Sequence, residues 1–181
     1  MIPGEDACCI LLYGDIGEYS DVTAAAIVRE LMEAEASGKR IDVRINSNGG
    51  DVYTGIAIFN ALRGSKADIH IYVDGIAASM ASVIALCGKP VEMSKYARLM
   101  LHSVSGGCYG NKTELRRCLE EVEALENTLC EMYAPKLGTS VEDIRARYFD
   151  DADHWLKADE ALALGFIDGV YDADPVPEDS T

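Results

Sequence analysis

The sequence is short of positive charge and of long apolar runs. Its 16 Lys and Arg residues stand against 31 Asp and Glu residues, so the formal net charge at pH 7 is −15. A chain this acidic is a poor ligand for nucleic acid or for an anionic membrane surface, and we expect neither as a partner. The apolar run 7–13 is too short to cross a bilayer, and no basic cluster of the signal-peptide kind precedes it. We therefore expect a cytoplasmic protein.

The six cysteines lack the spacing of a metal site. None forms a Cys-x-x-Cys pair, and no histidine stands at a metal-ligand spacing from them, so we expect neither zinc nor any other cofactor. Most of these cysteines lie in apolar patterns, where a free thiol behaves as a small hydrophobic side chain. A reducing compartment fits this usage.

The chain does have enough apolar sequence for one core. With 181 residues, of which 49% are hydrophobic and 26% charged, it has the composition of a single globular domain, which we place at residues 1–171. Acidic residues gather at the C-terminal end, where ten of them stand against one basic residue, Lys157, between residues 149 and 181. We predict that residues 172–181 form a flexible acidic tail, and we assign it no function.

Hydrophobic periodicity predicts strands and helices in alternation. The predicted strands are 7–13, 41–45, 69–73, 91–93 and 99–101, and the predicted helices run from residue 20 or 21 to 38, from 53 to 62, and through Ser79 to about 86. This order implies right-handed crossovers, and hence an α/β fold with a mostly parallel sheet covered by helices.

Ser79 stands at the junction of a predicted strand and a predicted helix. The strand 69–73 stops at Asp74-Gly75, and small residues surround the serine. A sharp strand-to-helix turn holds the first side chains of the helix out of the core and aims its unpaired N–H groups at the same place. This placement favours a nucleophile. The alternative is a serine that caps the helix, which is the usual role of an isolated serine in such a position.

Backbone donors and a base are predicted at the same edge of the sheet. Gly49-Gly50 follows the strand 41–45, so a backbone N–H of this turn, together with that of Met80, would form an oxyanion hole beside Ser79. Read alone, Asn-Gly-Gly is only a turn signal. Of the three histidines, His102 is the one at a strand end beside a glycine-rich loop. It is a candidate general base, although such a histidine is more often structural.

A carboxylate to orient His102 is less sharply indicated. Asp153 stands ahead of the last predicted helix, 158–165, but Asp150 and Asp151 compete with it. An acidic residue ahead of a helix is usually a cap. Spacing alone does not establish a triad.

Residues 111–133 predict one long helix, opened by a capping box, Asn111-Lys-Thr-Glu114, and ended by Pro135 and Gly138. Two sets of side chains repeat every seven residues along it, Leu115, Val122 and Leu129, and Cys118, Leu125 and Met132, with Leu119 and Tyr133 beside them. We interpret this seam as a contact between subunits, because the helix is longer than a small sheet needs. The alternative is an ordinary helix packed on its own sheet.

Four stretches together resemble the ClpP family of serine peptidases. They are Ile45-Asn-Ser-Asn-Gly-Gly50, Gly75-Ile-Ala-Ala-Ser-Met80, Met100-Leu-His102, and Asp153-His-Trp-Leu-Lys-Ala-Asp-Glu-Ala161 with Gly165-Phe-Ile-Asp168, in the family's order within residues 10–170. The resemblance implies a crotonase-like α/β fold with a protruding handle helix, a Ser-His-Asp triad and ring assembly. Carried over, Ser79 is the nucleophile, His102 the base, Asp153 the orienting acid, and Gly50 and Met80 the oxyanion donors.

The stretches 51–60 and 72–79 look most like the phage and prophage branch, whose members are called head maturation proteases. Several positions depart from the family pattern. Asn48 replaces a proline and would loosen the turn that holds Gly50, and Ser103-Val-Ser-Gly-Gly follows His102 in place of Gln-Pro. The third triad member is often Glu in the phage branch, and almost nothing precedes the first strand, where ClpP subunits carry an axial gate segment.

We therefore expect a serine endopeptidase that hydrolyses a peptide or protein substrate through an acyl-enzyme, in phage head maturation or in general proteolysis, as a homo-oligomeric ring. One alternative is a catalytically silent ring that acts as a scaffold or binding module. Another is an acyl-CoA enzyme of the crotonase type. Asp42 and Arg44 replace aromatic residues of the family's docking cleft for unfoldase loops, so we expect that a standard unfoldase ATPase does not dock.

Overall fold

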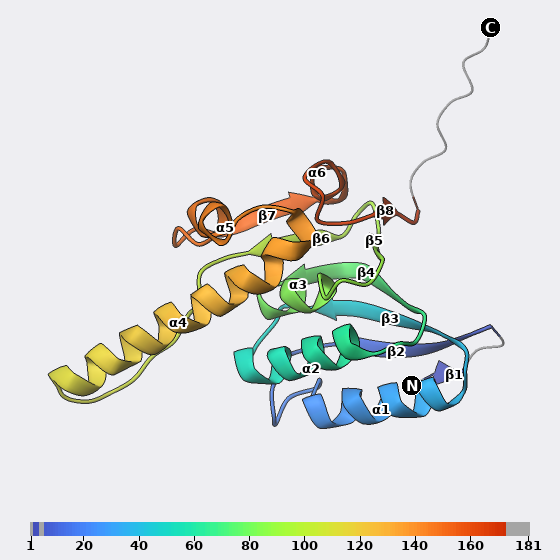
Figure 1. Cartoon of the computed structure of the whole chain (residues 1–181), viewed down its shortest axis with the longest axis horizontal. Coiled ribbons are helices and arrows are strands. Elements are labelled where there is room, and N and C mark those ends of the chain that lie inside the picture. The colour runs from blue at the N-terminus through green and yellow to red at the C-terminus, as the bar shows by residue number, and fades with distance from the viewer. Residues whose placement is uncertain (1, 4–5, 173–181) are drawn as a thin grey trace, which may run out of the picture.

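The computed structural model describes residues 2–3 and 6–172. Figure 1 shows the elements in chain order, and their bounds are β1 (Ile2–Pro3), β2 (Ala7–Tyr13), α1 (Ala24–Ala36), β3 (Arg40–Ser47), α2 (Val52–Gly64), β4 (Ile69–Ala78), α3 (Met80–Ala85), β5 (Val91–Met93), β6 (Arg98–Leu101), α4 (Lys112–Leu137), α5 (Val141–Tyr148), β7 (His154–Lys157), α6 (Ala158–Ala163) and β8 (Gly169–Val170).

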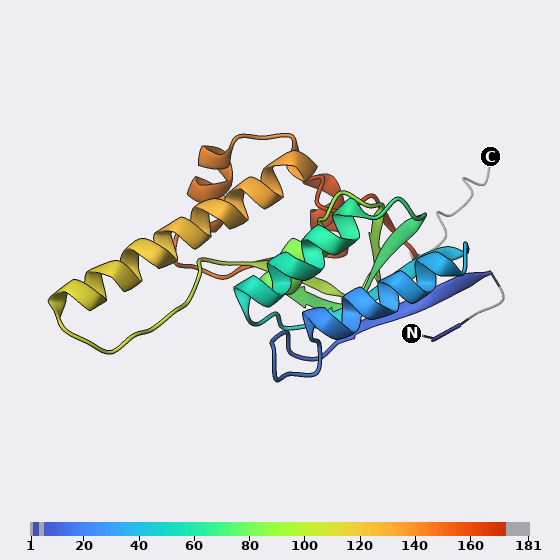
Figure 2. The same ribbon diagram turned by 60° about the horizontal axis from the view of Figure 1, so that its bottom comes forward.

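The strands form one sheet with a parallel centre. β2, β3, β4, β5 and β8 pair in that order, all in parallel, and β1 joins the outer edge of β2 in the antiparallel sense. β6 pairs in parallel with the end of β4, and β7 then runs antiparallel to β6. Helices α1 and α2 lie together over one face of the sheet (Figures 1 and 2). This arrangement confirms the predicted α/β fold with crossover helices and a mostly parallel sheet.

Alternation along the central strands separates the core from the opposite face of the sheet. In β3, Ile41, Val43 and Ile45 are fully buried, whereas Asp42 and Arg44 between them are half-buried. Successive side chains of a strand point to opposite faces, so the apolar set faces the helices and the charged set faces the other way. The buried apolar side chains of the sheet and helices form one hydrophobic cluster.

Helix α1 begins later than predicted. Its N-cap is Thr23, whose Oγ1 accepts a hydrogen bond from the Ala26 N–H at 3.1 Å. Asp21, one of the two predicted caps, instead accepts a hydrogen bond from the Asp15 N–H at 3.3 Å within the preceding turn. The prediction was wrong because the carboxylate closes that turn and leaves the cap position to Thr23.

Strand β4 continues past the point where it was predicted to stop. Asp74-Gly75 does not end the strand, because β6 supplies new backbone partners for residues 76–78. Gly75 instead makes room for a neighbouring side chain, since a Cβ on it would lie 2.5 Å from Asn46 Oδ1. The strand therefore runs to Ala78 and ends directly before Ser79.

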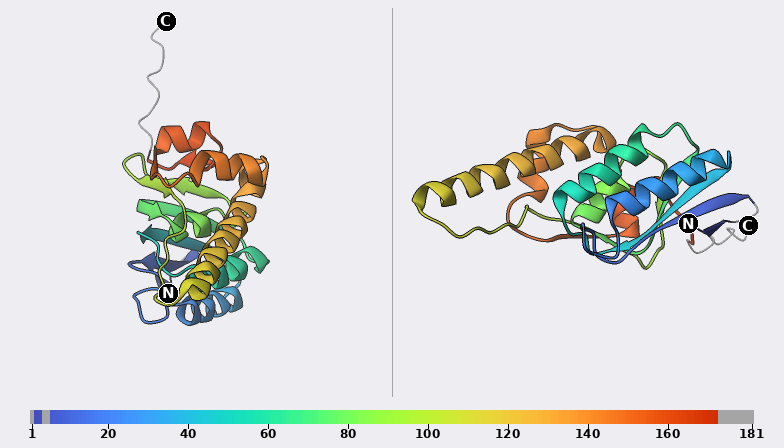
Figure 3. Two further views of the ribbon diagram at one scale, coloured as in Figure 1. Left: turned by 90° about the vertical axis from the view of Figure 1, so that its left-hand side faces the viewer. Right: turned by 90° about the horizontal axis from the view of Figure 1, so that it is seen from below.

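Helix α4 is the predicted long helix, and its N-terminal half projects away from the rest of the molecule (Figures 1 and 3). The capping box of Asn111 and Glu114 is present. Pro135 does not end the helix as predicted but lies inside its last turn, where a single missing donor is tolerated before Gly138 closes the helix with φ 62°. In the part of the chain that the structure describes, no helix is long and apolar enough to span a membrane.

The first residue of the predicted acidic tail is held against the body. Asp172 accepts hydrogen bonds from the Ser94 Oγ–H at 2.7 Å and the Lys95 N–H at 2.6 Å. Residues 173–181, which make up the rest of that predicted tail, lie outside the described residues.

Candidate active site

Ser79 occupies a tight turn between β4 and α3. Its backbone angles are φ 53° and ψ −126°, a region that costs a non-glycine residue about 1–3 kcal/mol. Within the described residues its side chain makes no capping hydrogen bond to α3, so it is not a capping serine. Its Oγ lies 2.8 Å from His102 Nε2 instead. The strained turn thus exposes the hydroxyl to a basic side chain.

The antiparallel pair β6 and β7 brings His102 next to Asp153. Leu101 at the end of β6 is paired with His154 at the start of β7, so the next residues in register are His102 and Asp153. His102 Nδ1 lies 3.1 Å from Asp153 Oδ1. The imidazole therefore stands between the serine hydroxyl and a carboxylate.

The two competing acids have other partners. Asp150 lies 2.7 Å from His154 Nε2, and this hydrogen bond holds the pKa of the Asp150 carboxyl below its usual value. Asp151 has φ 66°, and its backbone N–H donates to Ser103 Oγ at 3.0 Å. Of the three candidates, the structure brings Asp153 to His102.

Gly49-Gly50 lies directly against the Ser79 turn. A Cβ on Gly49 would be 2.9 Å from Met80 N, and a Cβ on Gly50 would be 2.1 Å from the Ile16 carbonyl oxygen. Only glycine fits so close to both backbones. Gly50 and Met80 both line the cavity at Ser79. The Met80 N–H is the first of α3, where helical N–H groups have no acceptor within the helix.

The turn at Asn48 is held without a proline. The buried Ser47 accepts a hydrogen bond from the Gly49 N–H through its Oγ at 3.1 Å. On the other side, the Gly49 carbonyl accepts from the Ile16 N–H at 2.9 Å, and the Asp51 N–H donates to the Ile16 carbonyl at 2.8 Å. The turn is thus tied on both sides, in contrast to the loosening expected from Asn48.

A cavity of about 180 Å³ opens beside Ser79. Its apolar walls are Val52, Met80, Val83, Leu129 and Tyr133. Beyond Gly50 and Val104 a second hollow of about 330 Å³ continues between the loop that follows His102 and helix α4. The two hollows share Gly50, Val52, Val104 and Ser105, so a groove leads from the serine along the helix.

Helix α4 contributes to this site in a way that the sequence did not indicate. Leu129 and Tyr133 were read as part of a seam between subunits, yet both are buried and line the cavity at Ser79. Glu126 of the same helix accepts a hydrogen bond from the Val104 N–H at 3.0 Å and so fixes the loop after His102. No local signal marks these residues, because only the packing of α4 brings them to the serine.

The assembled groups are those that nucleophilic acyl transfer needs: a strained serine, an imidazole in contact with it, a carboxylate behind the imidazole, and backbone donors in the same cavity. Among residues 2–3 and 6–172, no group of three His, Cys, Asp or Glu side chains is placed to hold a metal ion.

Comparison with known proteins agrees with the family resemblance. The model of the Clp protease family matches residues 7–174. The "ATP-dependent Clp protease proteolytic subunit" of Bacteroides fragilis (strain ATCC 25285) is 32% identical over 157 residues, which cover 84% of this chain and 75% of that protein. The "ATP-dependent Clp protease proteolytic subunit 1" of Prochlorococcus marinus (strain MIT 9312) is 35% identical over 163 residues, covering 88% and 83%.

Proposed function

The chain belongs to the Clp protease family, and from that premise we propose that it is a serine endopeptidase that cleaves peptide bonds through an acyl-enzyme on Ser79. The observation that carries the proposal is the row of contacts from Asp153 through His102 to the Ser79 hydroxyl, at 3.1 and 2.8 Å. The strained backbone of Ser79 supports it, because such strain persists where a function requires it.

The proposed reaction follows from the roles of these groups. Asp153 accepts the Nδ1–H of His102, which leaves Nε2 as the acceptor for the Ser79 proton. Ser79 Oγ then attacks the substrate carbonyl, and the N–H groups of Gly50 and Met80 stabilise the negative oxygen. His102 returns the proton to the leaving amine as the peptide bond breaks. A water molecule then attacks the acyl-enzyme while His102 accepts its proton, and His102 finally returns this proton to Ser79 Oγ as the ester bond breaks.

The groove is the proposed place of the substrate chain. A side chain next to the cleaved bond enters the apolar cavity at Val83 and Leu129, and the chain continues through the second hollow beside α4. We propose a peptide or an unfolded protein segment as the substrate, since an extended chain fits a groove that runs past Ser79.

The two other functions considered do not need this geometry. A silent scaffold has no use for a strained serine in contact with a histidine, and an acyl-CoA enzyme of the crotonase type needs backbone donors but no serine nucleophile. Both are therefore less well supported than the peptidase.

We propose a homo-oligomeric ring as the working form. The relatives are named as subunits, and the projecting half of α4 carries Leu115 and Leu119, which are 49% and 58% exposed. Apolar side chains that repeat along one exposed helix are a typical contact for a second copy of the chain.

A role in phage head maturation is the finer proposal. It is supported by the resemblance of residues 51–60 and 72–79 to the phage and prophage branch. In that role the enzyme cuts a capsid or scaffold protein at discrete sites, whereas general proteolysis reduces an unfolded protein such as casein to short peptides. The product pattern on both kinds of substrate distinguishes the two roles.

The names of the relatives include dependence on ATP, but we propose that this chain does not dock a standard unfoldase. Asp42 and Arg44 stand on the open face of the sheet. Arg40 holds Asp42 through two hydrogen bonds of 2.9 and 3.0 Å, and Arg44 pairs with Asp74. Docking an apolar loop here would remove water from two ion pairs, whose desolvation cost can exceed their attraction.

Aromatic rings complete this charged surface. The Arg44 guanidinium lies 5.2 Å from the centre of the Tyr72 ring and 5.7 Å from that of Tyr171. Asp74 also accepts hydrogen bonds from the hydroxyls of Tyr13, at 2.5 Å, and Tyr171, at 3.0 Å. Since the rings and charges already contact one another, an apolar loop that docked here would have to displace these contacts.

The experiment that tests the peptidase is labelling with a fluorophosphonate, followed by mapping of the modified peptide. We expect one label per chain at Ser79, and hydrolysis of fluorogenic peptides that stops when the label is complete. Heat-denatured protein is the matched control, because it keeps every serine but loses the contact with His102. A folded protein that takes no label supports the silent scaffold instead.

A further inference from the structure

Two buried hydroxyl side chains lie beneath Ser79 and take no direct part in the proposed reaction. Ser82 of α3 is fully buried, and Tyr133 of α4 is 2% exposed. Their oxygens are 2.6 Å apart. Ser82 Oγ also lies 2.6 Å from the carbonyl oxygen of Ser79, to which it donates its only hydrogen. Tyr133 must therefore donate to Ser82, and the three residues form a chain from Tyr133 to Ser82 to the Ser79 carbonyl.

The Ser79 carbonyl belongs to the same peptide unit as the proposed oxyanion donor. A trans peptide unit is planar and rigid, so its C=O and its N–H lie in one peptide plane and point in opposite directions. In this peptide plane the C=O is that of Ser79 and the N–H is that of Met80. A group that holds the Ser79 oxygen therefore also sets the direction of the Met80 N–H.

Three donors hold the oxygen of this peptide unit, two from the backbone and one from a side chain. The Ser79 oxygen accepts hydrogen bonds from the Ser82 N–H at 3.0 Å and from the Val83 N–H at 3.4 Å, while the Ser82 hydroxyl is the closest donor at 2.6 Å. Ser79 itself is in a strained conformation, φ 53°, from which relaxation would turn the peptide plane. The hydroxyl chain supplies an additional contact that resists this rotation.

Tyr133 is fixed in a position from which it can donate to Ser82. Its ring packs edge-on against Phe149, with centroids 6.2 Å apart, and it forms part of the cavity wall at Ser79. Burial raises the pKa of the Tyr133 hydroxyl well above its usual value, so this group keeps its proton, and can donate it, at neutral pH.

We propose that Ser82 and Tyr133 are positioning residues that aim the Met80 N–H at the reacting carbonyl oxygen by holding the Ser79 carbonyl. The inference rests on the proposed peptidase function and adds to it two residues that act through the backbone. Neither residue touches the substrate bond. The alternative is that the two hydroxyls only join α3 to α4.

The test compares Ser82→Ala, Tyr133→Phe and the double variant, with Tyr148→Phe as the matched control. Tyr148 packs edge-on against His154 and Phe166 rather than against the Ser79 turn. We expect kcat for a short peptide to fall about tenfold in Ser82→Ala and about fivefold in Tyr133→Phe, with KM unchanged, the size of effect that one lost hydrogen bond gives. The double variant should be no slower than Ser82→Ala, because both changes interrupt the same series of hydrogen bonds.

Active-site titration separates positioning from a general loss of structure. If the hydroxyls position Ser79, every chain still takes the fluorophosphonate, but the rate constant for labelling falls together with kcat. If they only join the helices, fewer chains are labelled and each labelled chain reacts at the wild-type rate. That second outcome, or additive losses in the double variant, would overturn the proposal.

A structural readout keeps the inference distinct from the peptidase proposal. Amide hydrogen exchange at Ser82 and Val83 should be faster in Tyr133→Phe than in Tyr148→Phe. Both N–H groups donate to the Ser79 carbonyl oxygen, which the two hydroxyls hold in place. If wild-type protein takes no label but exchange changes as expected, the peptidase proposal fails while the contact chain stands. If wild-type protein takes the label and neither exchange nor kcat changes, the positioning role alone is refuted.

Discussion

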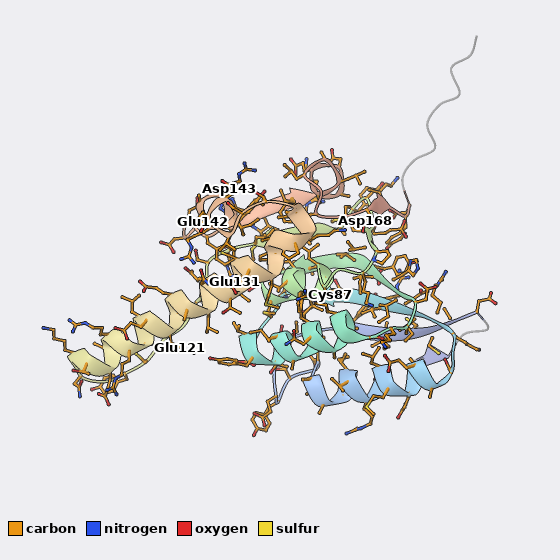
Figure 4. The ribbon with its side chains drawn as sticks, in the orientation of Figure 1. Cys87, Glu121, Glu131, Glu142, Asp143 and Asp168 are labelled. Carbon is orange, nitrogen blue, oxygen red and sulfur yellow. The ribbon has the colours of Figure 1, made fainter. Side chains whose placement is uncertain are left out.

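The two halves of helix α4 have similar sequence patterns and opposite surroundings. In the half near the body, Leu129, Cys130 and Tyr133 are buried against α3 and α5. In the projecting half, Leu115 and Leu119 stand 49% and 58% exposed. Figure 4 labels one residue of each half, Glu121 and Glu131, and both are exposed, so the contrast between the halves lies in their apolar residues.

The difference shows what a heptad pattern can and cannot indicate. The spacing of apolar residues predicts one apolar face along the whole helix, but it does not say what covers that face. The near half covers the candidate site and carries Tyr133. The projecting half lies beside the loop that follows His102, where Gly106 faces Val122, and its Glu121 accepts a hydrogen bond from the Tyr53 hydroxyl of α2. We therefore propose that the near half serves the candidate active site and that the projecting half joins subunits.

The largest effect should come from a change that removes the chemistry and leaves both halves of α4 intact. Ser79→Ala should lower peptide hydrolysis by about 10⁶, since the remaining groups cannot form an acyl-enzyme. Its native mass by light scattering should equal that of the wild type. Hydrolysis at the wild-type rate would refute the triad.

A smaller loss of activity should distinguish the two neighbouring histidine–aspartate pairs, His102 with Asp153 and His154 with Asp150. Asp153→Asn should lower kcat by about 10⁴, because an amide cannot hold His102 in the tautomer that accepts the serine proton. Asp150→Asn is the matched control, since its partner is His154. Equal losses in both variants would mean that the acid behind His102 has been assigned wrongly.

One variant in each half of helix α4 tests whether the two halves have different roles. Leu119→Glu should dissociate the assembly, seen as a lower native mass, with little change in the unfolding free energy of the subunit. Leu129→Ala should instead lower that free energy by about 2–5 kcal/mol, because it leaves a cavity in the core. If Leu119→Glu keeps the wild-type mass, the projecting half does not join subunits.

The smallest expected effect concerns the open face of the sheet, remote from both halves. Adding the unfoldase of the host with ATP should not speed the degradation of a folded substrate, and a pull-down should recover no complex. The Asp42→Tyr/Arg44→Tyr double variant restores aromatic residues at the docking positions and serves as the comparison. Degradation by the wild-type protein that requires both ATP and the unfoldase would refute this prediction.

Much of the fold follows from short-range patterns. The parallel strands, the capping box at Asn111 and the turn at Gly49-Gly50 were each predicted from a few adjacent residues, because burial on alternate positions, helix capping and glycine turns are local effects. Ser79 was likewise placed at the start of a helix, although the strand before it proved five residues longer than predicted. That extension depended on β6, a partner from another part of the chain.

The contacts that distinguish one candidate residue from another needed the tertiary structure. Asp153 reaches His102 because β7 pairs with β6, and β7 is a four-residue strand with a single buried residue, Leu156, too short a pattern to predict. Tyr133 reaches Ser82 because α4 crosses α3, although the two residues are 51 positions apart. Local preferences act over a few residues, whereas these pairings arise when distant segments bury apolar surface together, so only the folded chain brings them into contact.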